Sequence, residues 1–277
     1  MMDPGAARLP VLLYHKVDRR FEFGGTWVTP TQFEGHVRTL LERGYRFCAL
    51  EELVSPDDRA RPGDRRVAIA FDDGYRALED FAFPVLREYG VPASVFVVTG
   101  FIGKDNLWDV NVGWRRFDHM GWREMEAALA HGVRFHSHTH THRDLTRLNE
   151  AEARRELTLS RDLLERRLSQ KVRYVSYPFG IYDANVARWA EESGYEAGFT
   201  LFGRAGQNVK PLYRIERSAV YRIDTRGSVV RKLEGGPLAR VERIRDRVIN
   251  RCAGGTPVAK RILGRKARGR FAESEKS

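Results

Sequence analysis

Two neighbouring acids directly follow an apolar segment of the chain. Asp72 and Asp73 come after residues 67 to 71, Val-Ala-Ile-Ala-Phe, and Gly74 follows them. Neighbouring residues of a strand point to opposite sides, so both acids can face one site only where the strand breaks, and a glycine permits that break. One carboxylate can then bind a metal ion while the other takes a proton from the attacking water. The pair therefore predicts a metal-centred hydrolytic site.

A histidine cluster offers further ligands. Four of the eight histidines lie at positions 136, 138, 140 and 142. Neutral imidazole and carboxylate are the ligand types that a zinc site uses. In an extended backbone His138, His140 and His142 would share one face, whereas a turn would pair His138 with His142. The polar threonines between them favour the turn, so we predict His138 and His142 as ligands.

The positive charge of the chain is concentrated at its C-terminal end. The net charge is +11, and residues 231 to 277 hold 14 Lys and Arg against 5 Asp and Glu, which leaves +2 for residues 1 to 230. A nucleic-acid-binding domain carries its charge on the folded face, so we expect no nucleic-acid partner. We predict a folded domain of residues 1 to 230 and a basic helical tail of residues 231 to 277.

The size and the apolar content place bounds on the class of protein. With 277 residues, 42% of them hydrophobic, the chain can build a real core. It contains no run near eighteen apolar residues, and its first residues lack the pattern of a secretory signal, so we expect a cytoplasmic location. Cys48 and Cys252 lie far apart without metal-type spacing, which predicts incidental thiols.

Strand and helix patterns alternate along the first 200 residues. Apolar segments predict strands at residues 9–15, 46–49, 67–71, 93–98, 133–136, 172–175 and 195–200. Helical patterns lie between them at residues 29–43, 75–89, 122–130, 149–168 and 183–192, with a kink at Pro84. This alternation predicts an α/β fold, a deformed (β/α) barrel of about seven parallel strands whose catalytic residues gather at the C-terminal strand ends.

Three motifs resemble those of a known family, the metal-dependent polysaccharide deacetylases, which are carbohydrate esterases with a NodB-homology domain. Phe-Asp-Asp-Gly at residues 71–74 resembles the first motif, residues 138–145 resemble the second, and Tyr-Pro-Phe-Gly at residues 177–180 is a variant of the third. The resemblance spans residues 9 to 220. It implies the hydrolysis of an N-acetyl group on an amino sugar.

The resemblance also implies a role for each motif residue. Asp72 would be the catalytic base, and Asp73, His138 and His142 would hold one divalent ion, with zinc expected and cobalt or nickel as alternatives. The backbone N–H near Phe179 would face the oxyanion of the intermediate.

The third motif has further candidates. Pro178 restricts the loop that presents the N–H, and the rings of Tyr177 and Phe179 are candidates for contact with a sugar face. Ordinary core packing is the alternative for both rings.

Two features depart from the family pattern. Ser176 stands where many members carry the arginine that partners the catalytic carboxylate, so we expect Arg173 or Arg214 to replace it. Members also end with a Leu-x-His motif that supplies the catalytic acid, yet no histidine follows His142.

Leu-Tyr-His at residues 13–15 has the same local pattern as the missing motif. In a closed barrel the first strand adjoins the last, so His15 can take the position of the C-terminal histidine. We predict His15 as the general acid, with a buried structural histidine as the alternative. We expect solvated or packing roles for three other histidines, His36, His119 and His131. In the loop after residue 101 we expect at most weak substrate contacts, from Asn106, Trp108 and Asp109.

The basic tail contains an amphipathic helical pattern. Residues 238–251 repeat apolar side chains at helical spacing with arginines between them, at Leu238, Val241, Ile244, Val248 and Ile249. This stripe either docks on the barrel or binds an anionic membrane, which would place the protein at the inner membrane surface.

We therefore expect a metal-dependent hydrolase that releases acetate from an N-acetylated amino sugar in a polysaccharide, an oligosaccharide or a lipid-linked glycan precursor. A deformylase or amidase acting on a lipid-linked sugar or a small amide is the alternative enzyme. A metal-binding or glycan-binding module without turnover is the alternative from another class, suggested by Ser176 and by the missing C-terminal histidine.

Overall fold

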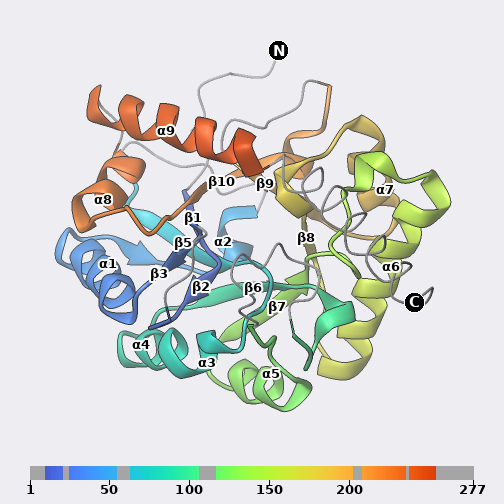
Figure 1. Ribbon diagram of the computed structural model, residues 1–277, viewed down its shortest axis with the longest axis horizontal. Coiled ribbons are helices and arrows are strands. Elements are labelled where there is room, and N and C mark those ends of the chain that lie inside the picture. The colour runs from blue at the N-terminus through green and yellow to red at the C-terminus, as the bar shows by residue number, and fades with distance from the viewer. Residues whose placement is uncertain are drawn as a thin grey trace, which may run out of the picture.

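A closed barrel of parallel strands with helices around it forms the body of the protein (Figure 1). The computed structural model describes residues 10–20, 25–54, 63–105, 117–201, 208–234 and 237–253. Seven strands close the barrel in these residues: β1 (Val11–Tyr14), β5 (Arg66–Phe71), β6 (Ala93–Val97), β7 (Val133–Ser137), β8 (Tyr174–Ser176), β9 (Ala197–Leu201) and β10 (Ile215–Ala219). The predicted deformed (β/α) barrel is thus confirmed.

The first and last strands meet, as the sequence predicts for a closed barrel. β1 pairs in parallel with β5 on one side and with β10 on the other. This arrangement brings the N-terminal strand next to the strand that carries Asp72 at its end. It also allows His15, directly after β1, to reach the catalytic face.

The set of strands differs by one from the prediction. β4 (Arg46–Phe47) pairs with β5 outside the closed ring, and β10, which the sequence patterns did not predict, is the seventh barrel strand. β10 is short and contains two charged residues, Glu216 and Arg217, which hide its alternation. β2 (Lys16–Val17) and β3 (Trp27–Val28) form a separate two-stranded sheet.

Helices follow the strands, and local capping sets the start of several of them. Thr29 and Asn149 each form a capping box with the residue three positions later, at the start of α1 and α6. The predicted helix around Pro84 is divided, because Pro84 lies in the first turn of a second helix where its missing N–H costs no bond. The helices are α1 (Pro30–Glu42), α2 (Leu50–Val54), α3 (Ala77–Phe81), α4 (Phe83–Glu88), α5 (Trp122–Leu129), α6 (Glu150–Leu168), α7 (Ala184–Glu192), α8 (Arg226–Glu234) and α9 (Pro237–Ala253).

Short 3-10 turns mark several loops, namely η1 (Thr99–Phe101), η2 (Leu145–Arg147), η3 (Pro178–Gly180) and η4 (Pro211–Tyr213). Among the described helices, none is both long enough and apolar enough to cross a bilayer. The predicted domain limit at residue 230 falls inside α8, and α8 packs against both α1 and α9. That limit stays a prediction.

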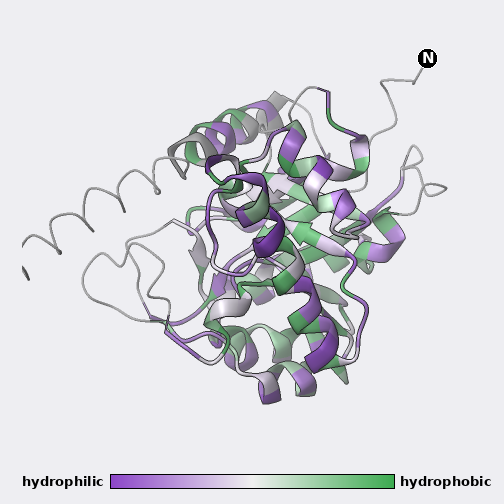
Figure 2. Cartoon of the chain, turned by 90° about the vertical axis from the view of Figure 1, so that its right-hand side faces the viewer, coloured by the Kyte–Doolittle hydropathy of each residue, from purple (hydrophilic) through white to green (hydrophobic). Residues whose placement is uncertain are grey.

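The core has two layers because strand residues alternate between the barrel interior and the helices. Leu13, Phe96 and Phe199 belong to the inner cluster, whereas Val95 and Phe135 belong to the outer one. Figure 2 shows the apolar strands in the middle and mixed polar and apolar colouring on the surrounding helices. The inner layer forms the floor below the C-terminal strand ends, where the predicted site lies.

Candidate active site

Three predicted metal ligands converge at the C-terminal ends of β5 and β7. Asp73, His138 and His142 are buried, and their ligand atoms lie within 4.8 Å of one another. The two Nε2 atoms are 3.2 Å apart, and Asp73 Oδ1 lies 3.6 Å from that of His138 and 3.7 Å from that of His142. A tetrahedral ion with bonds of about 2.0–2.1 Å separates its ligand atoms by roughly 3.4 Å. The residues therefore fit such an ion.

The strand break at the acids is sharper than a single glycine would make it. Asp73 has a φ of 71° and Gly74 a φ of 76°, so the left-handed conformation begins at the acid itself. Left-handed backbone costs a non-glycine residue about 1–2 kcal/mol, and such strain concentrates at functional sites. The break ends β5 at Phe71 and allows both carboxylates to face one site.

The histidine segment forms the predicted turn. Thr139 and His142 have φ values of 66° and 56°, and the Thr139 hydroxyl accepts a hydrogen bond of 3.1 Å from the His142 N–H. Buried Glu156 of α6 accepts bonds from the backbone N–H and the hydroxyl of Thr141. His140 takes no part in the ligand cluster, since its ring nitrogen bonds the Thr99 hydroxyl at 3.0 Å.

The ring of His138 is held in the orientation that a metal ligand needs. Its Nδ1 lies 2.8 Å from the carbonyl oxygen of Ser176. A carbonyl only accepts, so Nδ1 carries the proton and Nε2 presents its lone pair to the site.

Asp72 is bound by a buried arginine. Arg217 donates to Asp72 Oδ1 at 2.7 Å and to Oδ2 at 2.8 Å, and the Ser176 hydroxyl donates to Oδ2 at 3.1 Å. Burial alone would raise the pKa of Asp72, but Arg217 and His138 outweigh burial and hold that pKa at about 2. Asp72 is therefore ionised at neutral pH and lies 3.7 Å from His138 Nε2, beside the ligand cluster.

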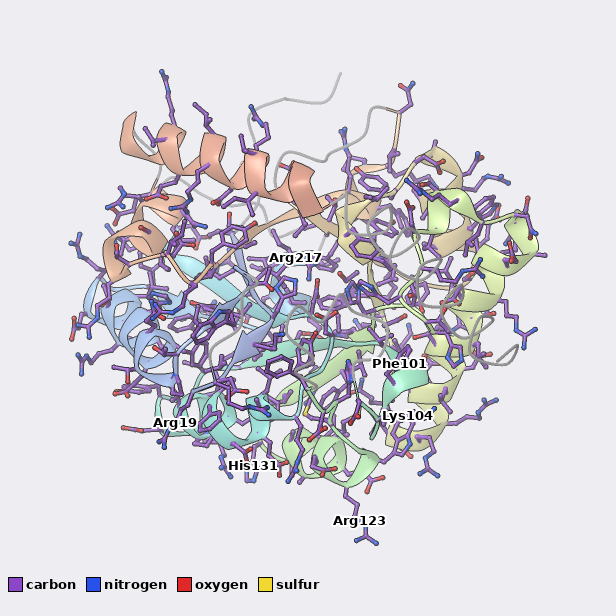
Figure 3. All side chains as sticks on the ribbon, in the orientation of Figure 1. Arg19, Phe101, Lys104, Arg123, His131 and Arg217 are labelled. Carbon is purple, nitrogen blue, oxygen red and sulfur yellow. The ribbon has the colours of Figure 1, made fainter. Side chains whose placement is uncertain are left out.

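The expectation that Arg173 or Arg214 partners Asp72 is wrong. Arg173 faces Glu196 with a half-exposed side chain, while Arg217 lies inside the barrel over the rings of Phe96 and Phe199. Figure 3 shows Arg217 toward the middle of the molecule, whereas the labelled Arg123 and His131 lie at its edge. The one sequence signal that could have identified Arg217 as the partner of Asp72 was its place at a buried position of β10, a short strand with alternating burial.

The loop of the third motif borders the ligand cluster. Phe179 is in the left-handed conformation with a φ of 59°, and its ring meets the ring of His142 edge-on at 4.6 Å. Pro178 is buried in the η3 turn. The expectation that the Tyr177 ring contacts sugar is wrong, because that side chain is fully buried and its hydroxyl donates to the carbonyl of Tyr213.

His15 lies within electrostatic reach of the site. The Asp72 N–H donates a hydrogen bond of 3.0 Å to the carbonyl oxygen of Tyr14, which is the residue before His15. Burial lowers the pKa of His15 to about 4, with Asp72 opposing the shift and Arg217 and His138 adding to it. Among the described residues, its Nδ1 has no hydrogen-bond partner. Its role as general acid stays a prediction.

The remaining histidines lie away from the ligand cluster. Of the solvated and packing roles expected for His36, the structure has the packing one, because its ring is buried and bonds the Tyr14 hydroxyl at 3.2 Å. His119 packs on the ring of Tyr75, and His131 is exposed. The weaker candidates of the rim loop lie outside the described residues, namely Asn106, Trp108 and Asp109.

A buried Asp and two histidines at metal-ligand spacing, with an ionised carboxylate beside them on a (β/α) barrel, are the features of a metal-dependent hydrolase. Comparison with known proteins identifies the family. The family model of polysaccharide deacetylases matches residues 59–198, which is half of the chain. The chain belongs to this family and is a carbohydrate deacetylase.

Two curated relatives agree with this assignment. The chain is 30% identical to "Putative polysaccharide deacetylase YxkH" of Bacillus subtilis, over 77% of this chain and 72% of that protein. It is 27% identical to the poly-beta-1,6-N-acetyl-D-glucosamine N-deacetylase of Staphylococcus epidermidis, over 70% of this chain and 68% of that protein.

The solved structures share the fold at lower identity. The deacetylase PplD of Streptococcus pyogenes, in complex with acetate, superposes with a TM-score of 0.70 at 23% identity and covers 83% of this chain and 99% of that one. IcaB of Ammonifex degensii gives a TM-score of 0.63 at 22% identity, with coverages of 76% and 91%.

Proposed function

We propose that this chain binds one zinc ion and removes acetyl groups from N-acetylglucosamine residues of a β-1,6-linked glycan or its precursor. The observation that carries the proposal is the position of ionised Asp72 beside the cluster of Asp73, His138 and His142. The glycan class is supported by the name of the Staphylococcus epidermidis relative. Zinc is supported by the imidazole and carboxylate ligands and their near-tetrahedral spacing, and cobalt and nickel are the alternatives.

The residues of this chain would divide the hydrolysis between them. An ion held by Asp73, His138 and His142 would supply Lewis-acid activation of water and of the acetyl carbonyl. Asp72 takes a proton from the water while the water oxygen forms a bond to the carbonyl carbon of the acetyl group. Arg217 keeps Asp72 ionised and fixed in orientation, so Arg217 is a positioning residue.

The second half of the reaction breaks the carbon–nitrogen bond. The backbone N–H of Phe179 would stabilise the oxyanion of the tetrahedral intermediate. His15 would then donate a proton to the departing amine, which yields acetate and a free amino sugar. Burial lowers the pKa of His15 to about 4, so its ring is neutral at pH 7 and must take up a proton during the reaction before it can act as the acid.

One of the two features that suggested a metal-binding or glycan-binding module without turnover is now explained. That alternative rested on Ser176 in place of the family arginine and on the missing C-terminal histidine. Arg217 now supplies the arginine, and Ser176 itself joins the pair by accepting from Arg217 at 2.7 Å. The same residues would serve any N-acyl group, so the choice of acetyl over formyl depends on the substrate pocket and is tested by comparing the two acyl groups.

Product analysis tests the proposal. Purified protein should release acetate from β-1,6-linked N-acetylglucosamine oligomers, lose this activity after treatment with a chelator, and regain it with zinc. N-formyl oligomers of the same length are the matched control substrates. Release of formate at a higher rate than acetate would favour the deformylase, and no release from either substrate with zinc bound would favour the module without turnover.

A further inference from the structure

The C-terminal helix α9 exposes an apolar row. Val241, Ile244 and Val248 are 63%, 60% and 57% exposed. Five large hydrophobic side chains are exposed among the described residues, and these are three of them. Their spacing of three and four positions places them on one face of the helix. Such a contiguous apolar face is a feature of interaction surfaces rather than of ordinary solvated helices.

The helix docks on the protein through its charged side instead. Glu242 and Asp246 are buried, and Lys232 of α8 pairs with Asp246 at 2.8 Å. Glu242 accepts from Arg231 of α8 at 2.6 Å, and Arg245 bonds Asp224. Of the two alternatives for the apolar stripe, docking on the barrel is therefore wrong for these three residues. Only Ile249 of the stripe packs against the barrel cluster, and the side chain of Leu238 lies outside the described ones.

This docking leaves a strongly basic outer surface. Glu242 and Asp246 are the two acids of α9, and both are used in ion pairs with the barrel side. Arg240 and Arg247 are exposed next to the apolar row, on a helix with five arginines in all. In the sequence, residues 254–277 add 7 Lys and Arg against 2 Asp and Glu. An apolar row flanked by arginines complements a surface that is apolar below and anionic above.

We propose that α9 binds the surface of an anionic lipid bilayer. Val241, Ile244 and Val248 enter the boundary between headgroups and acyl chains, and the exposed arginines pair with lipid phosphates. A second copy of the chain would cover the apolar row as well, but the excess of arginines beside that row would repel the same surface on another copy.

The position of α9 gives the contact a consequence for the enzyme. Helix α9 lies at the edge of the molecule (Figure 1), where it packs against α8 and contacts the η3 turn. That turn carries Phe179, whose ring meets metal ligand His142. A bilayer bound by α9 therefore lies on the side of the molecule that adjoins the loop bordering the metal site. The binding itself does not depend on the proposed function.

Vesicle sedimentation of the full chain tests the proposal. The protein should sediment with vesicles of equal parts phosphatidylglycerol and phosphatidylcholine and stay in solution with vesicles of phosphatidylcholine alone. The triple variant Val241→Ser, Ile244→Ser, Val248→Ser should have an affinity for the anionic vesicles that is lower by about tenfold or more. The reason is that membrane binding strengthens with the apolar area that the helix buries in the bilayer. Arg240→Gln with Arg247→Gln should weaken binding and reduce its dependence on salt.

The matched control is Leu41→Ser, since Leu41 is an exposed apolar residue on a different helix, α1. It should bind as the unmodified chain does, and all variants should release acetate from soluble oligomers at an unchanged rate, which separates this test from that of the proposed function. Equal sedimentation of the triple variant and the unmodified chain would overturn the proposal. So would a dimer in analytical ultracentrifugation that the triple substitution dissociates, because a second copy would then cover the row.

Discussion

Arg217 binds Asp72 through two parallel hydrogen bonds of 2.7 and 2.8 Å, from β10 to the end of β5 with β1 between them, and both side chains are almost fully buried. The planar guanidinium matches the carboxylate in a way that a lysine ammonium cannot. This pair fixes both the charge and the orientation of the residue that we assign as base.

Arg217→Lys should lower kcat/KM by about tenfold to a hundredfold, because a lysine cannot form the two parallel hydrogen bonds that orient the Asp72 carboxylate. Arg217 holds the pKa of Asp72 down, so the acid limb of the pH–rate profile should move to higher pH. Arg173→Lys is the matched control, since Arg173 pairs with Glu196 at the surface. An acid limb at the same pH in both variants would contradict this role.

His142→Ala should abolish stoichiometric metal binding, because only two of the three ligands remain. His140→Ala should retain one ion per chain, since that ring is bonded to Thr99 and lies outside the cluster. Metal analysis by mass spectrometry after dialysis measures both. Equal metal content in the two variants would contradict the assignment of His142, rather than His140, as a metal ligand.

His15→Ala should lower kcat by about a hundredfold or more while the metal content and KM stay near their original values, since a general acid contributes 10² to 10⁴ in rate. The measurement is steady-state acetate release on soluble oligomers. Substrates with a more acidic leaving amine should lose less activity, because they need less proton donation. Full turnover of the variant would remove His15 from the mechanism.

His36 should make the fold less stable as the pH falls. Burial lowers its pKa in the folded chain from 6.5 to about 4, although Asp224 opposes the shift. Between these values the unfolded chain binds a proton that the folded chain excludes, so the free energy of unfolding decreases by up to about 1.4 kcal/mol per pH unit on acidification. His36→Gln should flatten this part of the curve in urea titrations, whereas His131→Gln at the exposed surface should not change it. The same change in the pH dependence of the free energy of unfolding in both variants would contradict the attribution of this dependence to His36.

The ligands were predictable because each lies beside its partners in the chain. Asp72 and Asp73 follow an apolar strand, and His138 and His142 belong to one turn, so residue type and spacing indicated the cluster. The resemblance to the family then assigned the separate roles of the two acids. The partner of Asp72 was not predictable in this way. Arg217 is 145 positions from Asp72 and lies on a strand whose charged residues conceal its pattern.

The C-terminal helix shows a second limit of sequence patterns. Periodicity predicted the helix and its apolar stripe but not the face that docks. That choice depends on Lys232 and Arg231 of α8, which offer ion-pair partners to Glu242 and Asp246 and so turn most of the stripe outward. Such pairings depend on the folded positions of both helices, and neither helix reveals them alone.

The central claim is that a metal held by Asp73, His138 and His142 works with Asp72 as base. Asp72→Asn keeps the shape of the side chain but removes its ability to take a proton, so its metal content and acetate release, measured on one sample, test the claim most directly. We predict one bound ion per chain and acetate release reduced by about a thousandfold or more. A zinc-loaded Asp72→Asn variant that releases acetate at the rate of the unmodified chain would contradict it.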